Sequence, residues 1–216
     1  MAKARVAVLI SGSGTNLQAL IDSARDPAYP AQIVLVISNR PGAFGLTRAQ
    51  NAGIEALVLD HKGFPTRADF DAALDQALRA RDIELVCMAG FMRLLTPGFV
   101  EKWANKLINV HPALLPAFPG LDVQQRAIDA GVRFSGCTVH FVTAEMDAGP
   151  ILVQAVVPIL GDDTADSLSD RIRVQEHKAF PLALKLVAQG RVSIENGCAL
   201  IKDAAASSDC LINPAN

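Results

Sequence analysis

The fold is set by residues 5–20, which read RVAVLISGSGTNLQAL. The apolar run at the start of this stretch is rich in residues that favour strands, and Gly12 and Gly14 follow it directly. Glycine permits the sharp backbone turn that leads from a strand into a helix. Thr15 or Asn16 is of the type that caps a helix N-terminus. The stretch therefore predicts a strand, a tight glycine turn and a helix, which is the first unit of an α/β fold.

Four more apolar runs follow at intervals that leave room for helices between them. They read QIVLVIS (32–38), EALVLD (55–60), ELVCMAG (84–90) and KLINV (106–110). Nearly continuous Val, Ile and Leu indicates burial on both faces, as parallel strands require. The clearest helix lies between the third and fourth runs, over residues 66–82, because Thr66 and Asp69 form a capping-box pattern and apolar residues recur at helical spacing.

The C-terminal half departs from strict alternation. Residues 136–143 and 150–159 both resemble strands, but the turn between them is too short for a parallel crossover, so we expect an antiparallel pair. The other elements predicted here are a short helix over 123–131, a long helix over 164–190 that is bent or broken near Pro181, a hairpin around 195–197 and a loosely ordered tail from residue 204. The pattern as a whole predicts an open, three-layer, Rossmann-like α/β fold, with a mostly parallel sheet, an antiparallel C-terminal strand pair and helices on both faces.

The composition indicates a protein that acts on small molecules. The 216 residues are 50% hydrophobic and carry a net charge of −2, which is enough apolar material for one sizeable core and favours a single domain over residues 1–216. Lys and Arg are scattered, so the chain shows no basic block for nucleic acid or an anionic membrane. No apolar window approaches the roughly 18 residues of a spanning helix, and we expect a cytoplasmic protein.

The four cysteines do not indicate a metal site or a disulfide framework. Cys87, Cys137, Cys198 and Cys210 lie far apart in the sequence, without a C-x-x-C pair or a histidine at ligand spacing. We expect reduced thiols that mostly fill the core, because two of them lie inside apolar runs. No metal is expected.

The glycine turn suits a phosphate group. Free N–H groups at the start of the following helix, together with the helix dipole, favour an anion. A dinucleotide fingerprint would need a third glycine at position 17, where the chain has Leu17, and the second strand ends without the acidic residue that holds a ribose hydroxyl. A monophosphate site is therefore favoured over an NAD site. Arg40 leaves NADP open, and an ordinary glycine turn remains the structural alternative.

Asn109 and His111 are the strongest candidates for chemistry. They lie two residues apart, so a strand places both side chains on one side, at the carboxyl end where parallel sheets bind ligands. Three prolines, at positions 112, 116 and 119, restrict the loop that follows, and the bond before Pro116 could be cis or trans. An amide and a protonated imidazole together suit an oxygen that gains negative charge. Asp147 is the candidate that holds the proton on the imidazole, although a strand-capping histidine and an aspartate in a turn would leave the same pattern.

Five segments carry a resemblance to a known family. They read ISGSGTNLQALI, AGFMRLL, INVHPALLPAFPG, GCTVHFVTAEMDAGPI and VQEH. Over about residues 6–190 the chain resembles the phosphoribosylglycinamide formyltransferases, which use folate in purine synthesis. The resemblance implies that Asn109, His111 and Asp147 are the catalytic residues. It also implies a transferase that moves the formyl group of 10-formyltetrahydrofolate, a co-substrate, to the amine of phosphoribosylglycinamide, with no tightly bound cofactor.

The resemblance further implies where each substrate binds. The phosphate and ribonucleotide positions are Gly12, Ser13, Gly14, Thr15, Asn16, Arg173 and Glu176, and the folate positions are Arg67, Met92, Arg93, Leu94, Leu95 and Asn109. The phosphate would thus be held mainly by the N-terminal half (about 1–105), and folate binding and catalysis would fall to the C-terminal half (about 106–203), with a tail over 204–216. Two positions depart from the family pattern: Ala117 replaces a residue that is often basic, and Arg173 lies near an expected glutamine. His140 is interpreted as a packed, hydrogen-bonded residue outside the catalytic set.

Other functions stay open at this point. A formyltetrahydrofolate deformylase would use the same three residues with water as acceptor, and a non-catalytic nucleotide-binding module would need only the glycine turn. A methionyl-tRNA formyltransferase is disfavoured by the scattered charge. The partners expected are glycinamide ribonucleotide and folate, with no nucleic acid or membrane, and the protein is expected to be a monomer or a homodimer.

Overall fold

The computed structural model describes residues 2–204, 211 and 213, and its centre is a seven-stranded sheet in the order β3-β2-β1-β4-β5-β6-β7. The first five strands run parallel: β1 (Ala4–Ile10), β2 (Ala31–Ser38), β3 (Glu55–Val58), β4 (Leu85–Met88) and β5 (Leu107–His111). Strands β6 (Phe134–Phe141) and β7 (Ile151–Pro158) add two antiparallel pairings at one edge. The predicted sheet, with its antiparallel C-terminal pair, is confirmed.

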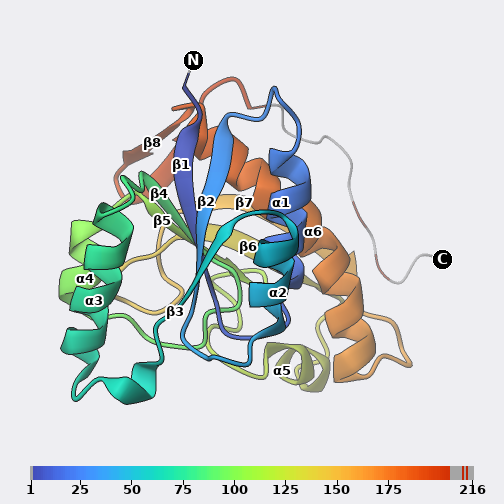
Figure 1. The fold of residues 1–216 in the computed structure, drawn as a ribbon. Coiled ribbons are helices and arrows are strands. Elements are labelled where there is room, and N and C mark those ends of the chain that lie inside the picture. The colour runs from blue at the N-terminus through green and yellow to red at the C-terminus, as the bar shows by residue number, and fades with distance from the viewer. Residues whose placement is uncertain (1, 205–210, 212, 214–216) are drawn as a thin grey trace.

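Helices cover both faces of the sheet, which gives three layers (Figure 1). Helices α1 (Thr15–Ala24), α2 (Phe44–Asn51) and α6 (Ala165–Ala188) pack on one face, and α3 (Arg67–Arg79) and α4 (Pro97–Lys102) pack on the other. Strand β1 shows why both faces must be apolar: Val6 and Val8 join the core beneath α1 and α6, whereas Ala7 and Leu9 join the core beneath α3. The short helix α5 (Val123–Asp129) packs against α6.

Two of the predicted helix features are wrong in detail. Neither Thr15 nor Asn16 caps α1; the N-cap is Gly14, which has a left-handed backbone (φ 70°), and no side chain caps the helix there. The sequence predicted a bend or a break near Pro181; the break is wrong, because α6 continues through this residue as one helix of 24 residues, and the bend stays a prediction. The capping box of α3, in which Thr66 and Asp69 bond each other's backbone N–H, is confirmed.

The remaining predicted elements are found. The C-terminal hairpin consists of β8 (Val192–Glu195) and β9 (Cys198–Ile201), with Asn196 and Gly197 at positive φ in its turn. Cys87 and Cys137 are buried in the core, as expected, and Cys198 is exposed on β9. Most of the tail predicted from residue 204 lies outside the described residues. Within the described part of the chain, no helix combines the length and apolar character that a membrane span needs.

The reversal of β6 decides where the candidate residues meet. Asn109 pairs in register with Met88 on β4 and with His140 on β6. Because β6 runs against β5, Phe141 at the end of β6 pairs with Ile108 near the start of β5, and Thr138 pairs with His111 at its end. The turn over residues 142–150 therefore leaves the sheet near the start of β5 and folds back, so that Asp147 lies beside His111 and His140. His111 ends β5 at the carboxyl edge of the parallel strands, where open α/β sheets bind ligands.

Candidate active site

The orientation of the Asn109 amide is fixed by His140. Nδ1 of His140 lies 2.9 Å from the Phe141 carbonyl oxygen, so this nitrogen carries the proton, and Nε2 lies 3.3 Å from Nδ2 of Asn109. Burial lowers the pKa of His140, and the nearby charge of His111 acts in the same direction. The neutral ring thus accepts one N–H of Asn109. The other N–H of this amide is left to bind a ligand in the cleft that Asn109 lines. The interpretation of His140 as a packed, hydrogen-bonded residue is confirmed.

His111 and Asp147 form a second group at the same edge. Nδ1 of His111 lies 3.4 Å from Oδ2 of Asp147, and Nε2 lies 2.9 Å from the Phe118 carbonyl oxygen. Both neighbours can only accept hydrogen bonds, so the arrangement suits the doubly protonated, positively charged ring. The same Oδ2 of Asp147 also accepts the backbone N–H of Gly120 at 2.9 Å. Asp147 therefore holds both the imidazole and the loop that covers it.

His111 is less open than the sequence suggested. Its side chain is only 6% exposed, and it does not line the cleft that Asn109 and Asp147 line. The reason lies in the loop over residues 112–122, which folds back so that Phe118 caps the ring. Asp147 is 12% exposed and faces His111, with a left-handed backbone (φ 54°) that places its carboxylate beneath the loop.

The loop over residues 112–122 is anchored to the antiparallel strands. The hydroxyl of Thr138 accepts the Leu115 N–H at 3.0 Å and donates to the Ala113 carbonyl at 2.7 Å. Gln154 donates to the Leu115 carbonyl at 2.8 Å. The bond between Leu115 and Pro116 is cis, which settles the question that the sequence left open. The stiff exit from β5 thus depends on hydrogen bonds from β6 and β7 as well as on the prolines.

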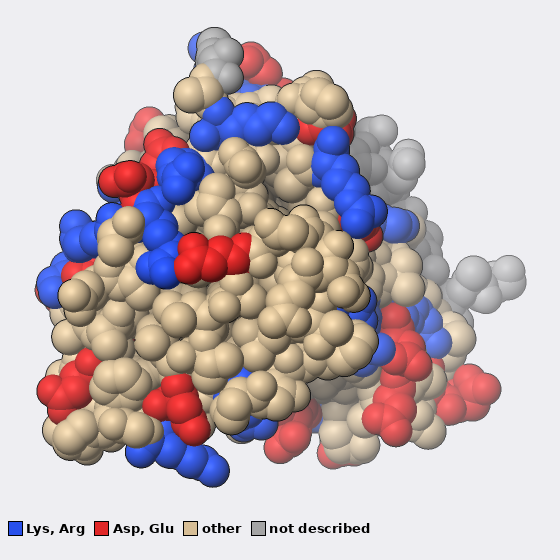
Figure 2. Space-filling view, viewed as in Figure 1, with Lys and Arg blue, Asp and Glu red and all other residues tan. Residues whose placement is uncertain are grey.

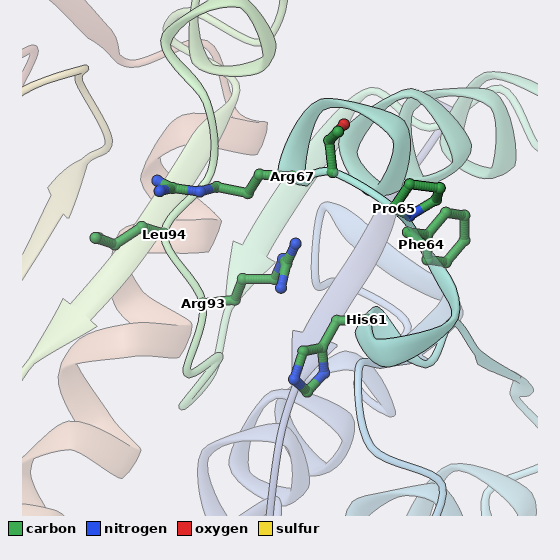
Figure 3. A pocket seen from close by; sticks show the side chains of 7 residues that line it. His61, Phe64, Pro65, Arg67, Arg93 and Leu94 are labelled. Atoms are coloured by element: carbon green, nitrogen blue, oxygen red, sulfur yellow. The ribbon is translucent and has the colours of Figure 1, made fainter.

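Four of the expected folate positions, Asn109 among them, line one cleft together with Asp147. Arg93, Leu94 and Leu95 share this cleft with Asn109, Asp147 and the turn over residues 142–147. The cleft continues into a groove of about 470 Å³, because Arg93 and Leu94 line both. Figure 3 shows His61 and Arg67 at this groove, with the side chain of Arg67 extending toward Leu94. An apolar cleft that opens onto two guanidinium groups suits a flat ring with an anionic tail.

The glycine turn forms a separate pocket of about 230 Å³. It is lined by residues 11–16 together with Arg40, Ala89, Gly90 and Met92, so Met92 lies on this pocket and not on the folate cleft. The first intrahelical bond of α1 runs from the Gln18 N–H to the Gly14 carbonyl, which leaves the N–H groups of residues 15–17 without helical acceptors. These groups are available to an anion.

Glu176 connects the glycine turn to the catalytic residues. Its carboxylate is 8% exposed and accepts a hydrogen bond of 2.8 Å from Nδ2 of Asn16. Burial raises the pKa of Glu176, although the Asn16 amide, Arg173 and His111 each lower it. The guanidinium of Arg173 is paired with Asp170 at 2.7 Å and does not line the glycine-turn pocket.

Several residues that shape the site were missed in the sequence. Gly45 of α2 donates its N–H to the Gly12 carbonyl at 3.1 Å and approaches Gly14 so closely that a Cβ on Gly14 would lie 2.7 Å from the Gly45 Cα. Nε of Arg48 donates to the Ser13 carbonyl at 2.9 Å. Both residues follow the second strand, and no motif links them to the first. Only the unusual run AFGL at the start of α2 gave a signal, since glycine is unfavourable there without a packing reason.

The face of the molecule that Figure 2 shows carries charges of both signs. On the face that Figure 2 shows, Lys and Arg are interspersed with Asp and Glu and form no continuous basic area. Among the residues that the structure describes, no group of three or more His, Cys, Asp and Glu side chains is placed to hold a metal ion.

Comparisons with known proteins agree with this geometry. A family model described as formyl transferase matches residues 4–184. Phosphoribosylglycinamide formyltransferase of Haemophilus influenzae is 42% identical over 91% of this chain and 93% of its own length. The crystal structure of glycinamide ribonucleotide transformylase 1 from Symbiobacterium toebii is 49% identical, with a TM-score of 0.91 over 93% of this chain and 95% of that chain.

Some relatives are much longer proteins. The trifunctional purine biosynthetic protein adenosine-3 of Gallus gallus is 52% identical over 89% of this chain, but the match covers only 19% of that protein. The chain therefore spans between 14% and 19% of the length of the trifunctional relatives. The match of the family model to most of the chain, together with the relatives that it covers almost completely, shows that the chain belongs to the formyl transferase family.

Proposed function

We propose that the protein transfers the formyl group of 10-formyltetrahydrofolate to the amine of phosphoribosylglycinamide, with tetrahydrofolate as the second product. The observation that carries this proposal is the single cleft in which Asn109 and Asp147 meet the folate positions Arg93, Leu94 and Leu95. The relatives named for this reaction support it. The reaction uses small molecules, and we propose that the protein carries it out in the cytoplasm.

The acceptor is proposed to bind between the glycine turn and α6. The free N–H groups at the start of α1 would hold its phosphate, and the buried carboxyl of Glu176 would receive its glycinamide end. Asn16 fixes the Glu176 carboxyl and belongs to the turn itself. This arrangement sets the distance between the phosphate and the reacting amine, which selects for the length of the acceptor.

The donor is proposed to place its ring in the cleft and its anionic tail against Arg67 and Arg93. The neutral amine of the acceptor attacks the formyl carbon, so that a C–N bond forms and the formyl oxygen becomes negative. The N–H of Asn109 that His140 leaves free donates to this oxygen, and the charge of His111 stabilises it. The bond from the formyl carbon to N10 of the folate then breaks. A proton leaves the former amine and reaches N10, which we propose occurs through water.

His111 can donate to the oxyanion only if its Nε2–H leaves the Phe118 carbonyl. We therefore propose that the loop over residues 112–122 shifts when both substrates bind. The Gly120 N–H donates to Asp147, so its hydrogen exchange reports this shift. Hydrogen exchange at Gly120 should change when both ligands are added, and unchanged exchange would contradict a role for loop movement.

The direct test uses purified protein with 10-formyltetrahydrofolate and glycinamide ribonucleotide, and follows tetrahydrofolate release. Release should require the acceptor. Asn109→Ala should lower turnover by roughly 100- to 1000-fold, the usual cost of losing one oxyanion donor. Asn51→Ala, which changes an exposed residue at the end of α2, is the matched control and should keep wild-type turnover.

The rival functions give different results in the same assay. A deformylase would release tetrahydrofolate at the same rate without the acceptor. A non-catalytic nucleotide-binding module would bind the ribonucleotide without release under either condition. Near wild-type turnover in Asn109→Ala would show that this amide does not stabilise the oxyanion.

A further inference from the structure

A buried chain of hydrogen bonds joins the glycine turn to the loop after β4. The hydroxyl of Ser11 accepts the backbone N–H of Met92 at 2.8 Å and donates to Oδ1 of Asn39 at 2.6 Å. Ser11 is 4% exposed and Asn39 is 1% exposed, so water does not compete for these bonds. The hydroxyl therefore bridges the loops that follow β1, β2 and β4.

Asn39 extends this chain to a fourth segment. Nδ1 of His61 lies 2.9 Å from the Asn39 carbonyl oxygen, which requires the proton on Nδ1. His61 begins the short 3₁₀ helix η1 (His61–Gly63) and lines the groove shown in Figure 3. The Asn39 N–H in turn bonds the carbonyl of Ile10 at the end of β1, at 3.4 Å. Asn39 is thus the point at which the ligand-binding loops of the parallel strands are tied together.

The two residues joined by the Ser11–Met92 bond lie next to the two proposed substrate sites. Ser11 directly precedes the glycine turn, and Met92 directly precedes Arg93, Leu94 and Leu95 of the folate cleft. Met92 itself lines the glycine-turn pocket. The hydrogen bond between Ser11 and Met92 therefore joins the loop of the glycine-turn pocket to the loop that lines the folate cleft.

The chain also favours one relative position of the two loops. Both bonds of the Ser11 hydroxyl are short, so a displacement of about 1 Å between the loops would break them. A buried polar group that loses its partner is destabilised by about 1–3 kcal/mol. A ligand that orders one loop then favours the position in which the other loop is already formed, and two such ligands bind cooperatively.

We propose that Ser11 and Asn39 are positioning residues that couple the binding of the phosphate-bearing acceptor to the binding of the folate donor. This inference rests on the proposed function for the identity of the two ligands. Neither residue touches the reacting atoms in this assignment. Their effect is on the affinity of each site when the other is filled.

The test is a binding cycle measured by titration calorimetry. The dissociation constant of glycinamide ribonucleotide is measured alone and with saturating tetrahydrofolate, and the ratio is the coupling factor. Wild type should show a factor of about 5 or more. In Ser11→Ala and Asn39→Ala the factor should fall to about 1, whereas Ser11→Thr, which keeps the hydroxyl, should restore it. Ser135→Ala is the matched control, because Ser135 is equally buried at 4% exposure and lies outside the chain of bonds.

Hydrogen exchange at the Met92 amide supplies a readout that needs no ligand. Exchange should be faster in Ser11→Ala than in wild type and unchanged in Ser135→Ala. The inference is overturned by a wild-type coupling factor of 1, or by an equal factor in wild type and Ser11→Ala. If wild type binds neither ligand, the proposed function fails instead, and Met92 exchange still decides whether Ser11 holds the loop. Should Ser11→Ala not fold, Asn39→Ala and Ser11→Thr carry the comparison.

Discussion

Replacing Asp147 by asparagine tests the electrostatic core of the site while keeping its shape. Oδ2 of Asp147 accepts from both His111 and the Gly120 N–H, and Oδ1 lies 3.8 Å from Nε2 of His140. Asparagine can place its oxygen at the first position, where it accepts the same two bonds, and its NH₂ then takes the place of Oδ1, 3.8 Å from a His140 nitrogen that already accepts from Asn109. The hydrogen-bond geometry is thus retained, and the main change is the loss of the negative charge.

The distance between the two charges gives the size of the effect. At 3.4 Å and an effective dielectric constant of about 20, opposite unit charges attract by about 5 kcal/mol. A neutral hydrogen bond in the variant keeps about 1 kcal/mol of this, so charged His111 loses about 4 kcal/mol of support. Since about 1.4 kcal/mol corresponds to a factor of ten, kcat at pH 7 should fall by roughly 1000-fold.

The assay is tetrahydrofolate release at saturating substrates, measured from pH 5 to pH 9 for wild type and Asp147→Asn. Asp129→Asn removes an exposed carboxylate from α5 and serves as the control, which should match wild type. Thermal unfolding of each variant separates loss of activity from loss of structure. A kcat within threefold of wild type across this pH range would refute the argument that the charge of Asp147 supports charged His111.

Three further predictions concern stability and reactivity. Glu176→Gln should abolish acceptor binding yet stabilise the fold at neutral pH. Burial raises the pKa of Glu176, so the native protein loses stability as pH rises above 4.5, the pKa in the unfolded chain. Denaturant unfolding from pH 4 to pH 8 should therefore show that the excess unfolding free energy of the variant over wild type grows with pH. Asp163→Asn should destabilise the fold by about 1–3 kcal/mol at pH 7, because Asp163 accepts two bonds from Arg171; these bonds hold its pKa below the ordinary value of 3.8, so the deficit measured by denaturant unfolding should shrink as pH falls below that value. Burial raises the pKa of Cys137 to about 12, so a thiol reagent followed by peptide mass spectrometry should label exposed Cys198 well before Cys137.

The sequence predicted most of the sheet because burial on both faces leaves a distinct pattern. Each of the five apolar runs became a parallel strand, and the short turn between residues 143 and 150 correctly predicted the reversal of β7. The cap of α1 could not be predicted in the same way. Thr15 and Asn16 favour a capped start by type, but Gly14 takes the N-cap position in a left-handed conformation and packs against Gly45, which leaves no room for a side chain and comes from the next helix, α2.

The residues of the candidate site could be predicted from the sequence, but the hydrogen bonds between them mostly could not. The spacing of Asn109 and His111 placed both at one sheet edge, and the structure brings Asp147 to the same edge. That Phe118 covers the imidazole could not be predicted, because this depends on a positive φ at Phe118 and on how the loop over residues 112–122 is hydrogen-bonded to β6. Backbone carbonyls carry no sequence signature.

The antiparallel return of β6 has a consequence for how this protein could acquire a different acceptor. It places the proposed oxyanion donors and the cleft proposed for the folate ring on the stretch from Met88 to Asp147, whereas Asn16 and Glu176, the proposed contacts of the acceptor, lie outside this stretch. In this proposal, separate segments of the chain contact the two ligands, so each set of contacts can be mutated independently. A library of variants at positions 16 and 176 alone would test new nucleophiles, water included, while the residues from Met88 to Asp147 stay unchanged.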